Sequence, residues 1–179
     1  MPLCKPIILN LFAGPGAGKS SLAADVFAEL KWHGVNCEIV TEVAKELAWI
    51  NDGRSRDQLY IIGNQMERVD SLLGKVDVIV TDSPVMMALA YCPPELYHGL
   101  KSHLEEWTSK YDNFNVRVIR TKPYNPLGRF QDEAAAKKLD NIIADLPVFI
   151  DRVYPGEKMS TPAITQDILT KLSDRLKEV

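Results

Sequence analysis

The sequence predicts a single α/β domain, spanning residues 1–179, that is built on a parallel β-sheet. Short apolar runs alternate with longer stretches that have the period of amphipathic helices, as in chains of βαβ units. The run at 7–12 is apolar almost throughout, which is typical of a central strand covered on both faces. A glycine-rich segment at 13–20 follows this run directly and leads into a stretch of good helix formers.

The remaining elements follow from the same patterns. Further strands are expected at 37–41, 76–81, 116–121 and 148–153. Helices are expected at 19–32, 42–50, 57–73, 132–146 and 165–176, with Thr165 as a candidate cap of the last one, and in the segment striped by Leu96, Leu100, Leu104, Trp107 and Tyr111. The predicted inner faces are Leu59, Ile62, Met66, Val69 and Leu73 in one helix and Ala135, Leu139, Ile142 and Leu146 in another.

Composition disfavours several classes of protein. A net charge of −3 gives no global positive field that would recruit nucleic acid or an anionic membrane. The three cysteines, Cys4, Cys37 and Cys92, are scattered, so they offer neither a disulfide framework nor zinc-ligand spacing and suit a reducing compartment. The apolar N-terminal stretch is too short for a signal peptide, and no run is long enough to span a bilayer. We expect a cytoplasmic protein without a membrane partner.

The segment Ala-Gly-Pro-Gly-Ala-Gly-Lys-Ser at 13–20 has the spacing of a Walker A motif, with Ala13 where the strict form has glycine. Glycines at these positions let successive backbone N–H groups turn toward phosphate oxygens. Lys19 is expected to reach the β- and γ-phosphates, and the Ser20 hydroxyl is expected to bind Mg²⁺. The residues predicted to bind ATP in this loop are Gly14, Gly16, Ala17, Gly18, Lys19, Ser20 and Ser21.

Two acidic residues follow predicted strands. Asp82 ends the third strand, at the carboxyl edge of the sheet where ligands bind, so it is predicted to orient Mg²⁺ or to accept a proton; it could instead cap the next helix. Glu42 stands in the same relation to the second strand and is an equal candidate for the base, although it could merely complement a helix dipole. The sequence leaves open which of the two serves as the base.

Basic and amide side chains complete the predicted site. The segment 122–131 is rich in Pro, Gly and Asn, with Arg120 at its base and Arg129 toward its far end, so it is predicted to be a lid that brings arginine to the triphosphate. The alternative is a solvated loop whose arginines pair with nearby acids. Gln65 and Arg68 lie one turn apart on a predicted helix and are candidates to read a base edge and to hold the acceptor, or else belong to a solvent face.

Taken in this order, these motifs resemble the nucleoside and nucleotide kinase group of P-loop proteins, including small bacteriophage kinases and nicotinamide riboside kinase-like proteins. The resemblance implies a three-layer P-loop kinase fold with sheet order 2-3-1-4-5 and a lid arginine at Arg129. It also implies an acceptor site near Glu42, Gln65 and Arg68, with Glu42 matching the base of deoxynucleoside kinases. Those kinases carry an arginine after the acid of the third strand, where this chain has Ser83 and a proline, so the acceptor stays open.

The predicted function is an ATP- and Mg²⁺-dependent kinase that acts on a hydroxyl of a nucleoside, nucleotide or nucleobase-type acceptor. Alternatives are a kinase that modifies hydroxymethylated pyrimidines in DNA, a regulatory NTPase, and a binding module that has lost catalysis. A Ras-like switch is disfavoured because Asp82 is followed by Ser-Pro-Val, without the glycine three residues after the aspartate that an Asp-x-x-Gly motif requires. The chain is also short for a motor ATPase, and its oligomeric state is not predicted.

Overall fold

A computed structural model describes residues 5–125 and 132–177. Its five strands form one parallel sheet with the order β2-β3-β1-β4-β5, which confirms the predicted order. The strands are β1 (Ile7–Phe12), β2 (Cys37–Val40), β3 (Val78–Thr81), β4 (Asp112–Ile119) and β5 (Arg152–Pro155). The phosphate loop therefore starts at the end of the central strand.

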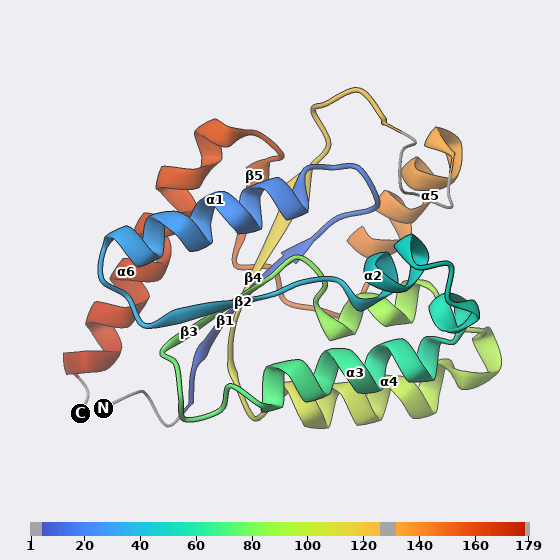
Figure 1. The fold of residues 1–179 in the computed structure, drawn as a ribbon, viewed down its shortest axis with the longest axis horizontal. Coiled ribbons are helices and arrows are strands. Elements are labelled where there is room, and N and C mark those ends of the chain that lie inside the picture. The colour runs from blue at the N-terminus through green and yellow to red at the C-terminus, as the bar shows by residue number, and fades with distance from the viewer. Residues whose placement is uncertain (1–4, 126–131, 178–179) are drawn as a thin grey trace.

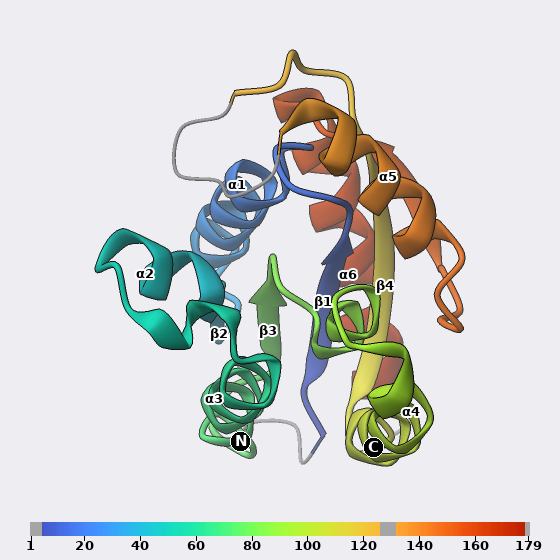
Figure 2. The same ribbon diagram turned by 90° about the vertical axis from the view of Figure 1, so that its right-hand side faces the viewer.

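Helices cover both faces of the sheet and give three layers (Figures 1 and 2). On one face, Ile7, Leu9 and Leu11 of β1 share a core with α1 (Lys19–Trp32) and α6 (Thr161–Lys177). On the other, Ile8 and Phe12 share a core with helices α3 (Gln58–Asp70) and α4 (Pro94–Thr108) and with the 3-10 helix η2 (Val85–Ala90). Alternating side chains of one strand thus supply both cores.

Helix α2 (Val43–Trp49) follows β2 in the chain, and helix α5 (Glu133–Ala144) precedes β5. The 3-10 turns η1 (Gly53–Arg56) and η3 (Lys158–Ser160) precede α3 and α6. In Figure 2, α2 and α5 lie on opposite sides of the upper end of β3 and β1. None of the described helices combines the length and the apolarity needed to cross a bilayer.

Several predicted boundaries are wrong. The fifth strand is Arg152–Pro155 rather than 148–153, because Val148 and Ile150 pack against the core beneath α3 and α4 instead of joining the sheet. The fourth strand begins at Asp112, four residues earlier than predicted. The last helix begins at Thr161, so Thr165, which is 1% exposed, lies inside it and does not cap it.

Two predicted inner faces are confirmed only in part. In α3, Ile62 and Val69 are buried as predicted. Ile61 and Gln65 are buried as well, whereas Leu59 is 62% exposed. In α5 the buried residues are Ala136 and Ile143, whereas Ile142 is 47% exposed. Packing against the rest of the chain determines which side of each helix is buried. Single apolar residues are common on exposed surfaces, so the apolar pattern alone can indicate the wrong side.

Candidate active site

The loop between β1 and α1 has the backbone geometry of a phosphate-binding loop. Gly16 and Gly18 have φ angles of 79° and 105°, in the left-handed region where a side chain would be strained. Gly18 directly precedes α1, so the free N–H groups of the first turn of that helix point toward the loop. The motif predicted from spacing therefore sits on the strand–loop–helix framework it requires.

Lys19 lies inside this loop. Its side chain is 8% exposed, and Nζ donates hydrogen bonds to the carbonyl oxygens of Ala13 (2.7 Å) and Gly14 (3.1 Å). Burial lowers the pKa of the ammonium group below its ordinary value, and the nearby carboxylates of Glu42 and Asp82 oppose that shift. The loop thus holds a desolvated cation whose hydrogen bonds are to neutral carbonyls, which an anionic ligand can replace.

A cleft of about 370 Å³ extends from the phosphate loop along the carboxyl edge of the sheet. Its lining includes eight of the residues predicted for the site, namely Gly16, Gly18, Lys19, Ser20, Ser21, Glu42, Gln65 and Asp82. They come from four separate segments of the chain, and the parallel sheet brings these segments to one edge.

Asp82 and Glu42 lie where the two strand ends were expected to position them. Asp82 directly follows β3 and is 4% exposed, and its Oδ1 accepts no hydrogen bond from the described residues. A buried carboxylate oxygen without a donor indicates a missing partner, such as a metal-bound water or an acceptor hydroxyl. Glu42 occupies the position before α2 without capping it and also faces the cleft.

The oxygen donors of Ser20 and Asp82 fit Mg²⁺, which favours oxygen ligands and retains several waters beside nucleotide phosphates. Within the described residues, no group of three or more His, Cys, Asp or Glu side chains forms a metal site built from protein alone. A metal in this cleft would therefore depend on phosphate oxygens for much of its coordination.

Gln65 is 3% exposed and uses only half of its amide. Its Oε1 accepts a hydrogen bond of 3.3 Å from the backbone N–H of Val43, and its Nε2 has no partner among the described residues. A ligand in the cleft can therefore receive a hydrogen bond from Gln65, whereas a bidentate reading of a base edge would have to share Oε1 with the N–H of Val43.

Arg68, the other predicted acceptor residue on α3, is not among the residues that line the cleft. Its Nη1 and Nη2 donate to the two carboxylate oxygens of Glu46 at 2.7 and 2.6 Å. Glu46 also accepts a hydrogen bond from Thr41. Through Glu46, Arg68 connects α3 to α2 and to the residue after β2. The structure therefore does not place Arg68 beside Gln65 in the cleft.

Arg120 lies against the phosphate loop, as predicted for the base of the lid. Its guanidinium donates to both oxygens of Asp140 at 2.8 and 3.1 Å, and its side chain is 12% exposed. Its remaining nitrogen, Nη1, is buried without a described partner and lies 3.2 Å from the point where a Cβ on Gly16 would stand. Arg129 and most of the predicted lid lie outside the described residues.

Three residues of the site were missed by sequence reasoning. Asp140 in α5 holds both Arg120 and the backbone N–H of Gly14. Tyr91 lines the cleft, and burial, together with Glu42, raises the pKa of its hydroxyl, which keeps it a hydrogen-bond donor. Gly156 packs so closely on the loop that a Cβ there would overlap the carbonyl oxygen of Ala17. Only Gly156 carried a local signal, as a glycine at the end of a strand.

Comparison with known proteins agrees with this geometry at the level of the fold. No protein-family model and no curated protein sequence matches the chain. Mycobacterium tuberculosis APS kinase in complex with AMPPNP and APS matches with a TM-score of 0.54 and 14% identity, over 97% of this chain and 99% of that chain. A cysteine-to-alanine mutant of the same kinase matches with a TM-score of 0.53 and 15% identity, over 97% and 99%.

The fold is that of the P-loop kinases. The two APS kinase structures, the sheet order and the loop at the end of β1 agree on this. Shikimate kinase from Aquifex aeolicus also matches, with a TM-score of 0.49 and 16% identity over 94% of this chain and 98% of that chain.

Proposed function

We propose that this protein is an ATP- and Mg²⁺-dependent kinase that transfers the γ-phosphoryl group to a hydroxyl of a nucleoside, nucleotide or nucleobase-type acceptor. The observation that carries the proposal is the single cleft that joins the phosphate loop to Glu42, Asp82 and Gln65. Phosphoryl transfer needs an oriented donor, a positioned hydroxyl, a proton acceptor and positive charge, and the residues along this cleft can supply each.

The phosphate loop binds the donor. The backbone N–H groups from Gly14 to Ser21 surround the β- and γ-phosphates, and Lys19 exchanges its two carbonyl partners for phosphate oxygens. Arg120 lies beside Gly16 and adds positive charge from the other side of the loop. Arg129 in the predicted lid is proposed to add a further guanidinium when the site closes.

The acids act on the acceptor. As the acceptor oxygen bonds to the γ-phosphorus and the bond to the β-phosphate oxygen breaks, Glu42 or Asp82 takes the hydroxyl proton and ADP leaves. Ser20 and Asp82 would hold Mg²⁺, which supplies charge neutralisation on the phosphates. A carboxylate that binds Mg²⁺ is a poor proton acceptor, so the proposed metal role of Asp82 favours Glu42 as the base.

The acceptor contacts the far half of the cleft. Gln65 offers the two N–H donors of Nε2 and Tyr91 one hydroxyl, which suits a ligand with acceptor oxygens or ring nitrogens. Arg68 remains a proposed acceptor residue only if its pair with Glu46 opens. A pyrimidine within DNA is the alternative acceptor, although the net charge of −3 does not favour a polyanion. We propose a cytoplasmic location, which suits the free thiols of Cys37 and Cys92.

An acceptor panel with γ-labelled ATP tests the proposal. The panel holds nucleosides, deoxynucleoside monophosphates, nicotinamide riboside, and DNA with or without hydroxymethylated pyrimidines; the resemblance to bacteriophage and nicotinamide riboside kinases motivates the last two classes. Label on one class of acceptor, lost in Glu42→Gln but with ATP binding retained, supports the proposal and assigns the base. Label released only as phosphate favours a regulatory NTPase instead.

A further inference from the structure

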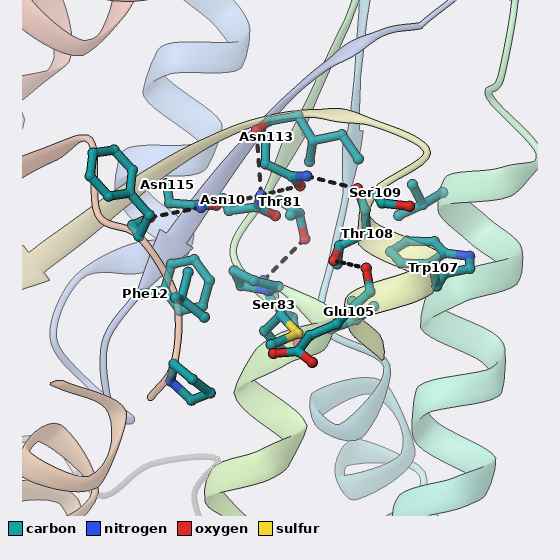
Figure 3. Close-up of a pocket in the computed structure, with 18 residues that line it drawn as sticks. Asn10, Phe12, Thr81, Ser83, Glu105, Trp107, Thr108, Ser109, Asn113 and Asn115 are labelled. Atoms are coloured by element: carbon teal, nitrogen blue, oxygen red, sulfur yellow. Dashed lines mark hydrogen bonds between the residues drawn. The ribbon is translucent and has the colours of Figure 1, made fainter. Parts of the chain in front are cut away.

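A second cavity of about 230 Å³ lies between the sheet and the α3–α4 layer (Figure 3). Its floor is a polar row across three adjacent strands, because Asn10 of β1 is in register with Thr81 of β3 and with Asn115 of β4. Asn10 is 7% exposed in a strand whose other residues are at most 2% exposed. A buried polar row at the centre of a parallel sheet requires partners for its polar atoms.

Hydrogen bonds fix the orientation of the three amides. Asn113 Nδ2 donates to the carbonyl of Thr108 at 2.8 Å, and Asn115 Nδ2 donates to the carbonyl of Phe149 at 2.9 Å. Their Oδ1 atoms therefore turn toward Asn10, whose Nδ2 donates to them at 3.0 and 2.9 Å. With both N–H groups used, the Oδ1 of Asn10 is left as an acceptor, and no described residue donates to it.

Thr81 supplies the complementary group. Its Oγ1 accepts a hydrogen bond of 3.1 Å from the N–H of Ser83, which leaves the hydroxyl hydrogen free to be donated. The side chain is 2% exposed. Adjacent strands are about 4.8 Å apart, so the floor presents one acceptor and one donor on neighbouring strands, within reach of two polar atoms of the same small ligand.

The rest of the cavity selects an uncharged ring. Among the residues that the structure describes, no lysine, arginine or histidine lines it, and the carboxylate of Glu105 is already paired with Lys101 at 3.3 Å. The walls carry Phe12 and Trp107, which suit a flat apolar body. An apolar cavity of about 150 Å³ holds one benzene, so this volume accommodates one substituted six-membered ring.

We propose that this cavity binds a small, uncharged ring that carries an amide or lactam group. Asn10 accepts the N–H of the ligand, and Thr81 donates to its carbonyl oxygen. Ser83, Pro84 and Val85 line both this cavity and the cleft with the phosphate loop. An occupant therefore touches the segment that directly follows Asp82, and binding here is coupled to the geometry of the larger cleft.

Three tryptophans make the test independent of any activity. Trp107 lines the second cavity, Trp49 lines the larger cleft, and Trp32 is 90% exposed. Benzamide and 2-pyridone are titrated to about 10 mM, a range suited to ligands of so few atoms, while the indole N–H signals are followed by NMR, assigned with Trp→Phe variants. Benzoate, which has the same ring without a donor and with a charge, is the matched probe.

The proposal predicts saturable shifts of Trp107 with both neutral probes, unchanged Trp32, and no shift with benzoate. Asn10→Leu removes the acceptor at similar volume and weakens binding by at least about tenfold, the loss expected for one buried hydrogen bond. Val148→Phe fills the cavity without touching the polar row and gives the same loss if Asn10→Leu does not fold. Shifts confined to Trp49, equal binding of benzoate, or no shift of Trp107 overturn the proposal.

Discussion

The carboxylate of Asp140 accepts a hydrogen bond of 2.8 Å from the backbone N–H of Gly14, a residue 126 positions earlier in the chain. The same carboxylate binds the guanidinium of Arg120. One side chain of α5 thereby fixes the first glycine of the phosphate loop and the arginine that lies over it. The helix that follows the predicted lid is thus physically connected to the glycine-rich loop after β1.

Replacing Asp140 by asparagine should weaken nucleotide binding. The amide can still accept from Gly14, but the ion pair that orients Arg120 is lost. We expect the dissociation constant for Mg²⁺–AMPPNP, measured by calorimetry, to rise about tenfold, within the range for hydrogen bonds to charged groups. Glu133→Gln, an exposed change on the same helix that breaks only a pair with Lys137, is the control. Equal affinity in both variants would show that Asp140 does not position the loop.

Gln65→Met should separate acceptor binding from ATP binding. The buried Nε2 has no described partner within the protein, so its proposed partner is the acceptor. We expect KM for the acceptor to rise about tenfold while KM for ATP stays within about twofold, and stability to fall by about 1 kcal/mol through the lost bond to Val43. The exposed neighbour change Glu67→Gln serves as the control. A rise in KM for ATP alone would contradict this assignment.

Gly156→Ala should disturb the phosphate loop by steric overlap alone. A Cβ at this position would overlap the carbonyl oxygen of Ala17, which is backbone and cannot swing aside. We expect a loss of about 1–3 kcal/mol in the free energy of unfolding, as for other overpacked sites. Gly99→Ala meets nothing within 4 Å in α4 and should stabilise the protein slightly. Thermal melts of both variants check the contrast, and an unchanged melting temperature in Gly156→Ala would refute the close packing.

The Glu46–Arg68 pair should give a pH-dependent contribution to stability. The hydrogen bonds from Arg68 lower the pKa of Glu46 below its ordinary value of 4.5. The folded state therefore favours the ionised form, and the stabilisation is present above pH 4.5 and disappears as the pH falls through the lowered pKa. Because the pair is partly exposed, Glu46→Gln should cost at most about 1 kcal/mol at neutral pH. Urea unfolding of both proteins at pH 7 and pH 3 measures this, and a gap that widens in acid would reverse the sign.

The fold could be predicted from local patterns because each element carried its own signal. The apolar run of β1 and the glycines after it positioned the central strand and the loop. β2 and β3 end at Val40 and Thr81, shortly before Glu42 and Asp82, nearly as expected. β5 was placed too early because Val148 and Ile150 look like strand residues yet pack in the core. The 3-10 turn η2 has no helical repeat and was not predicted.

The site could be predicted only in part, for a related reason. Lys19, Glu42 and Asp82 each follow a strand, and the topology of a parallel sheet brings such positions together. Asp140 lies in the middle of a helix, where an acidic residue is ordinary, and only tertiary contact shows what it binds. Arg68 was assigned by its distance from Gln65 along the helix, which does not reveal that Glu46 already holds it.

A single-turnover reaction with γ-labelled ATP tests the kinase proposal most directly. The protein, in excess over labelled Mg²⁺–ATP, is mixed with the pooled acceptors, and the label is separated into organic product, inorganic phosphate and unreacted ATP. Lys19→Ala is run in parallel, with Lys31→Ala as a control that removes an exposed lysine from the same helix. The proposal predicts label on an organic hydroxyl in the wild type and in Lys31→Ala, and none in Lys19→Ala. Label found only as inorganic phosphate, or equal transfer by Lys19→Ala, would contradict it.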